Sequence, residues 1–221
     1  MSSETQIANR ALTKIGAGRI LSLLDDTNEG RTLNSMFAQV RDAELRRHRW
    51  KFALKRDSLL ALVAAPAWGF LYQFPLPSDF LALVQVNDIY IRPASKAVGP
   101  WQVERASDGS GQVILTDLTA PLKVRYVSRV DNAALFDPLF VECFACKLAL
   151  ESSDSIAKGI VDKDSLEKGY KFALTEAVRA DAIEAPPDEL PWGTWLESRE
   201  GASVGLQGSS QFYGTSGFTV I

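Results

Sequence analysis

Cys143 and Cys146 are the two cysteines of the chain, and their C-x-x-C spacing is typical of redox-active thiols and of zinc sites. A zinc site needs further Cys or His ligands, but the sequence has no second C-x-x-C and a single histidine, His48. Both cysteines also fall on an apolar stretch with helical spacing, where a small side chain packs well. We therefore predict that they are core residues and that the chain uses neither a metal nor a cofactor.

His48 is the residue whose ordinary pKa best suits acid–base catalysis near neutral pH. A catalytic histidine needs a nucleophile within reach and a partner that orients its ring, and neither can be assigned from the sequence. Glu44 stands four residues earlier in a stretch with helical spacing. We therefore expect a surface pair between Glu44 and His48 on one helix face.

Paired carboxylates are the third possible source of chemistry, since they hydrolyse glycans or phosphoesters. Asp25 and Asp26 precede a helix in a turn, and Asp79 follows Pro77-Ser78 in another, so turn formation explains all three. The sequence also lacks a glycine-rich phosphate loop. We expect no catalytic residues, and a cell-wall hydrolase is the least favoured alternative.

The segment from Arg41 to Asp57 has the strongest charge asymmetry, with seven Lys or Arg against three Asp or Glu and a local charge of +4. Basic residues interleaved with aromatic ones can follow a phosphate backbone, but they also suit salt bridges to an acidic neighbour. The formal charge of −3 argues against a surface devoted wholly to nucleic acid, so we favour a subunit interface over DNA. The candidate contact residues are Arg41, Arg46, Arg47, Arg49, Trp50, Lys55 and Arg56.

Helical spacing dominates the first quarter of the chain. Ser3 and Gln6 form a possible capping box at the start of a first helix, which Gly16 would end. A second helical pattern follows and is expected to continue or bend through residues 49–60. The longest apolar stretches of the chain, such as residues 59–65, are far shorter than the roughly 20 residues that cross a bilayer, so we expect no membrane span.

The middle of the chain reads as β structure, and helices return after it. Prolines, glycines and β-branched residues fill residues 64–130, with a hairpin signal at residues 107–111. Asp137-Pro138 then marks the start of a long helix, and a last helix follows Asp164. These patterns predict an α+β fold in which N- and C-terminal helices form a bundle and a β-rich lobe is inserted between them.

The predicted domains follow from this order. Residues 1–63 and 131–184 form the helical bundle, residues 64–130 the β-rich lobe, and residues 185–221 an extended C-terminal arm. The last 21 residues carry no charge and five glycines, yet they keep aromatic side chains that a simple disordered tail lacks. We predict that the arm docks on a neighbouring subunit, in preference to a free end, through the anchors Trp192, Trp195, Phe212 and Tyr213. The alternative that Trp192 and Trp195 fold back on their own domain stays open.

The chain resembles the tail tubular protein A, or head-to-tail adaptor, family of short-tailed bacteriophages. The resemblance spans about residues 3–199 and rests on the order of several segments. These segments are ANRALTKIGAGRI, EGRTLNSMFAQVRDAELRRHRWKFALKR, YQFPLPSDFLALVQV, ILTDLTAPLKVRYVSRV and AIEAPPDELPWGTW. The uncharged tail after Gly201 has no counterpart in the family pattern.

The resemblance implies a non-enzymatic virion protein of the phage neck, made in the host cytoplasm. About twelve copies would form a ring between the portal of the filled head and the tail nozzle, and viral DNA would leave through its channel without sequence recognition. Two alternatives remain open at this point. One is a head-completion or stopper protein, and the other is a DNA-binding module that uses the basic segment.

Overall fold

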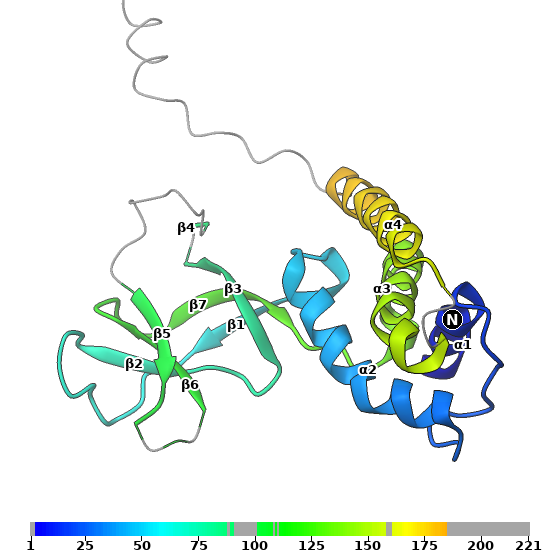
Figure 1. Cartoon of the computed structure of the whole chain (residues 1–221). Helices are drawn as coiled ribbons and strands as arrows, with labels where there is room; N and C mark the ends of the chain where they lie inside the picture. The colour runs from blue at the N-terminus through cyan, green and yellow to red at the C-terminus, as the bar shows by residue number, and fades with distance from the viewer. Residues whose placement is uncertain are drawn as a thin grey trace, which may run out of the picture. The chain divides into compact units, whose positions relative to one another are not determined.

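The structure is a computed structural model that describes residues 3–87, 89–90, 101–107, 109, 111–157 and 161–184. Its fold is α+β, as predicted: two N-terminal helices, two antiparallel sheets, and two C-terminal helices that pack back on the N-terminal ones (Figure 1). The helices are α1 (Glu4–Lys14), α2 (Asn28–Arg47), α3 (Pro138–Ala157) and α4 (Lys163–Ile183). The predicted arm, residues 185–221, lies outside the described residues.

Helix α3 is the centre of the helical part, since α1, α2 and α4 all contact it (Figure 1). Phe140, Phe144 and Leu148 are fully buried along it, and Phe37 of α2 meets the ring of Phe144 with centroids 5.1 Å apart. A helix that is apolar nearly all round has to be covered by its neighbours. None of the helices in the described part of the chain is long and apolar enough to span a bilayer.

Local signals in the sequence set the helix ends. Ser3 and Gln6 form the predicted capping box, and Gly16 has a φ of 71°, which ends α1 without strain. Oδ1 of Asp137 accepts hydrogen bonds from the backbone N–H groups of Leu139 and Phe140, so the predicted start of α3 is confirmed.

The strands lie between α2 and α3 in the sequence and form two antiparallel sheets. The first has the order β1-β7-β3-β4 and the second the order β2-β6-β5. The predicted hairpin at residues 107–111 joins β5 to β6. The strands are β1 (Leu54–Leu59), β2 (Tyr72–Pro75), β3 (Phe80–Val86), β4 (Ile89–Tyr90), β5 (Trp101–Arg105), β6 (Gln112–Thr116) and β7 (Leu122–Ser128).

The first sheet has two different faces. Leu122, Val124 and Tyr126 alternate along β7 and pack with Phe74 and Ile114 of the second sheet, which confirms the predicted apolar face of this strand. Val127, on the other face, belongs to the core of the helical part. The first sheet therefore links the two sets of elements.

The prediction that helix continues or bends through residues 49–60 is wrong. Helix α2 ends at Arg47, a short 3-10 turn covers Lys51–Ala53, and β1 begins at Leu54. The strand exists because it pairs along its whole length with β7, about seventy residues later in the sequence. A strand that is held by so distant a partner has no local signal in the sequence.

Residues 3–184 of the described chain belong to one compact unit, and the proposed division into domains remains a prediction.

Candidate interaction surface

The candidate residues of the basic segment do not form one surface. Arg41 is buried, and its guanidinium group makes ion pairs with Asp42 at 3.0 Å and with Asp131 at 2.8 Å. Arg46 has an exposed side chain, but its Nη1 donates a 2.8 Å hydrogen bond to the carbonyl oxygen of Leu81. These two arginines therefore tie α2 to the chain around the first sheet.

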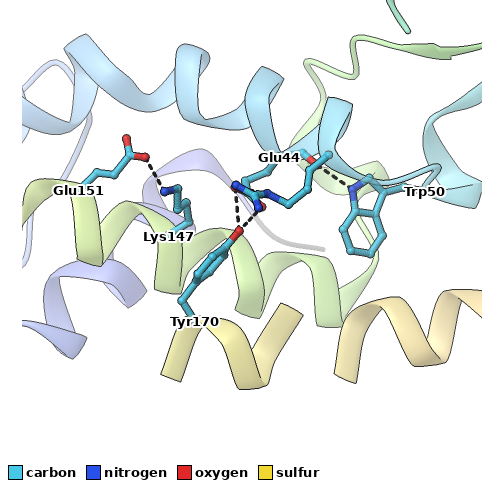
Figure 2. A network of polar contacts seen from close by, with 6 residues as sticks. Glu44, Trp50, Lys147, Glu151 and Tyr170 are labelled. Atoms are coloured by element: carbon cyan, nitrogen blue, oxygen red, sulfur yellow. Dashed lines mark hydrogen bonds and ion pairs between the residues drawn. The ribbon is translucent and has the colours of Figure 1, made fainter. Parts of the chain in front are cut away.

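Glu44 is the centre of a buried polar network, shown in Figure 2. Its side chain is fully buried, and both carboxylate oxygens accept the hydroxyl of Tyr170 on α4, at 3.0 and 2.9 Å. Arg47 donates from Nε to the same carboxylate at 3.2 Å and lies 5.7 Å from the centre of the Tyr170 ring. Burial and the nearby negative charge of Glu44 raise the pKa of Tyr170 well above its usual value, so the phenol stays protonated and keeps donating.

Trp50 packs in the helical core. Its side chain is 1% exposed, its ring lies 5.1 Å from that of Phe140, and its Nε1 donates to the backbone carbonyl of Glu44 at 2.9 Å (Figure 2). The prediction that Trp50 contributes to an interaction surface is therefore wrong for the folded chain. A tryptophan followed by Phe52 indicated an aromatic contact, but the sequence alone does not tell a core contact from a surface one.

The predicted pair between His48 and Glu44 is also wrong. His48 caps the C-terminal end of α2, and its Nε2 lies 3.0 Å from Oδ2 of Asp181 on α4. Asp181 also accepts the backbone N–H of Lys51 at 2.7 Å. The helix ends at Arg47, so spacing of four residues no longer places His48 beside Glu44. The histidine has a structural partner from the far end of the chain.

Lys55 and Asp79 join β1 to the start of β3. The Lys55 Nζ lies 2.9 Å from Oδ2 of Asp79, and the hydroxyl of Tyr126 donates to Oδ1 at 3.1 Å. Burial alone would raise the pKa of Asp79, but the hydrogen bonds from Lys55 and Tyr126 outweigh it and lower the pKa. Burial and the hydrogen bond to Asp79 raise the pKa of Tyr126 to about 12.

Two members of the predicted set, Arg49 and Arg56, have exposed side chains. Arg49 makes an interaction of its own and is not free. Arg56 lies in β1 opposite Arg125 of β7 and lines an open depression together with Lys123. Lys123 and Arg125 lie outside the predicted segment, and their alternation with buried residues along β7 is the signal that places them on the opposite face.

Cys143 and Cys146 are free thiols buried on α3, as predicted. Burial raises the pKa of Cys143 to about 12, and the charge of Glu44 acts in the same direction. Burial also raises the pKa of Cys146. Neither is poised as a nucleophile, and the described residues include no group of three His, Cys, Asp or Glu side chains that would hold a metal.

Large apolar side chains are exposed between β1 and β2. Trp68 is 86% exposed and Leu60 72%, and Val63 and Leu71 are exposed as well. Together these four residues are called the apolar loop below. Part of it, with residues of β5 and β6, lines a pocket of about 180 Å³. Leu60 and Val63 belong to the apolar run of residues 59–65, but nothing in the sequence predicts that they are exposed, because prolines and glycines in the same stretch indicate only a turn.

The four candidate arm anchors, Trp192, Trp195, Phe212 and Tyr213, lie outside the described residues, so their contacts stay a prediction. The chain matches no protein-family model. It also matches no curated protein.

Proposed function

We propose that this chain is a structural virion protein, an adaptor that assembles into a ring between the portal of a phage head and the tail nozzle and that forms part of the DNA channel. The exposed apolar loop is the observation that carries the proposal. Free soluble proteins rarely expose several large apolar side chains together, and such patches mark contacts with other proteins. Leu60 and Trp68 have little contact within their own chain.

The arrangement of the fold also supports an assembly role. In the head-to-tail adaptor family that the chain resembles, helices build a bundle and a β region forms a separate lobe, and the described elements of this chain follow the same order of helices, strands and helices. A fold of this class has many uses, so the order alone does not specify a function. Together with the ordered sequence segments, it favours the adaptor over other virion proteins.

The alternative of a DNA-binding module on the basic segment has less support. Arg41, Arg46 and Arg47 bind groups of their own chain, and Lys55 pairs with Asp79. Cations that already have partners contribute little to a phosphate contact. The second alternative, a head-completion or stopper protein, would use the same exposed loop and differs only in its neighbours.

Light scattering on the purified full chain tests the role of the apolar loop in assembly. Trp68→Ser removes the aromatic ring of the apolar loop. Phe172→Ser is a matched control, because Phe172 is an aromatic residue on α4 that is 71% exposed. We expect the wild type and Phe172→Ser to form the same large oligomer, and Trp68→Ser to shift toward the monomer. A wild type that stays monomeric alone and with portal would contradict the proposal.

A further inference from the structure

Among the residues that the structure describes, the helical core covers one face of the first sheet over only part of its length. Leu54 of β1 and Val127 of β7 pair with each other and pack in the core of the helical part. Two residues further along β1 and two residues back along β7, the same face carries Arg56 and Arg125, which are also paired. The core of the helical part does not extend to this second pair.

The register of β1 against β7 gathers three cations at the end of this face that the helical core does not reach. Arg56 lies opposite Arg125, and Ser58 lies opposite Lys123. Directly paired residues share a face of the sheet, and so do residues two apart on one strand. Arg56, Lys123 and Arg125 therefore lie on one face, called the cationic sheet face below.

This face is hollowed and its lining is polar. It forms a depression of about 560 Å³ whose lining also includes Ser58, Gln85 and Asn87. Asp57 is the one carboxylate of that lining within the described chain, and its Oδ1 accepts the backbone N–H of Ser58 at 2.8 Å. Asp57 pairs with Val124, so its side chain belongs to the opposite face of the strand. It therefore does not offset the cations on their own face.

Two cations of this face, Arg56 and Lys123, differ from those on neighbouring elements, while Arg125 makes an interaction within the chain. Lys55 pairs with Asp79 and Arg129 with Asp42, whereas Arg56 and Lys123 have no ion pair with any residue that the structure describes. Like charges on directly opposite residues of a sheet destabilise it. Arg56 facing Arg125 is such a pair, and a bound anion would relieve the repulsion.

We propose that the cationic sheet face binds the phosphate backbone of double-stranded nucleic acid without reading its sequence. Lys123 and Arg125 are two residues apart, roughly 6.8 Å along an antiparallel strand, which suits a regular row of single charges. Protein interfaces have an apolar core. Among the lining residues that the structure describes, only Val124 is apolar, and it is buried toward the other face, so an acidic protein fits less well. The lining side chains that the structure describes include no aromatic one for stacking on unpaired bases.

This inference depends on the sheet face and not on ring formation. It also differs from the DNA-binding module considered above, because of the seven candidates in the basic segment only Arg56 belongs to this face.

Fluorescence anisotropy of labelled random-sequence duplexes with the full chain at 50 to 200 mM NaCl tests the proposal. If one copy makes two phosphate contacts, through Arg56 and Lys123, the slope of log K against log salt is about −1.8. Arg56→Thr and Lys123→Thr should each weaken binding about fivefold to tenfold at 0.1 M salt and make the slope shallower by about one. Lys168→Thr, on the exposed surface of α4, removes the same charge elsewhere and should leave binding unchanged.

Stability and competitor measurements separate the possible outcomes. Arg56→Thr should leave the urea midpoint equal or higher, since it removes the repulsion from Arg125, so a loss of binding cannot be attributed to unfolding. Absent duplex binding, or unchanged binding by both variants, overturns the proposal. Equal competition by poly-glutamate, or tighter binding of a single strand of the same length, overturns it too. Light scattering on the same samples measures ring formation independently of duplex binding.

Discussion

The hydroxyl of Tyr170 on α4 donates to the carboxylate of Glu44 on α2, with oxygen–oxygen distances of 3.0 and 2.9 Å. These residues are far apart in the sequence, and the contact joins the N-terminal and C-terminal helices across α3 (Figure 2). A fully buried carboxylate is costly unless its oxygens are satisfied. The tyrosine and Arg47 satisfy it here.

Tyr170→Phe should therefore lower the free energy of unfolding by about 1.5–3 kcal/mol, the usual range for a hydrogen bond to a charged group. Urea unfolding followed by circular dichroism measures the change. Tyr72→Phe is the control, because the described residues offer the Tyr72 hydroxyl no hydrogen bond. In a double-mutant cycle with Glu44→Gln, Tyr170→Phe should lower the free energy of unfolding clearly less in the Glu44→Gln background than in the wild type. Strict additivity would rule out the proposed coupling.

Asp79 should make stability depend on pH in the acid range. Its pKa in the folded chain lies below the ordinary value of 3.8, so the unfolded chain binds the proton more readily. The stabilisation is present above about pH 4 and is lost as the pH falls through the folded pKa. The urea midpoint of the wild type should exceed that of Asp79→Asn near neutral pH, and the difference should shrink below pH 4. Lys55→Gln should reduce this pH dependence in part, and parallel pH profiles for all three proteins would contradict the assignment.

The cysteines should be unreactive in the native chain. The pKa of Cys143 is raised to about 12 and both thiols are buried, so little thiolate forms at pH 8. Ellman's reagent should react slowly with the native protein and with two thiols in denaturant. Rapid native reaction, or a disulfide formed reversibly by mild oxidation, would restore the redox interpretation of the C-x-x-C spacing.

Removal of residues 185–221 should leave the rest folded. Residues 1–184 form a compact unit with its own cores, so the shortened chain should keep the circular dichroism spectrum of a folded protein and unfold cooperatively. The predicted arm anchors would be lost, and the oligomer seen by light scattering should dissociate or shrink. If the shortened chain assembles like the full one, the arm does not hold the subunits together.

Elements with local signals were predictable from the sequence. Ser3 with Gln6 and Asp137 with Pro138 set helix starts through contacts within a few residues, and alternation revealed the buried face of β7. Strand β1 was missed because half of its six residues are charged and its pairing with β7 is distant in sequence.

The candidate site was less predictable than the fold. Charge counting found the basic segment, but it could not tell which cations are used internally. The partners of Arg41 and Arg46 include Asp131 and the Leu81 carbonyl, both supplied by distant parts of the chain. Burial of Trp50 depends in the same way on α3. The cationic sheet face required the register of β1 against β7 before Arg56, Lys123 and Arg125 could be grouped.

Electron microscopy of the full chain mixed with the portal protein of the same phage tests the central claim most directly. The proposal predicts a closed ring of copies of this chain, stacked on the portal along a common axis with an open channel. Portal rings that remain unchanged beside unassembled copies of the chain would contradict it.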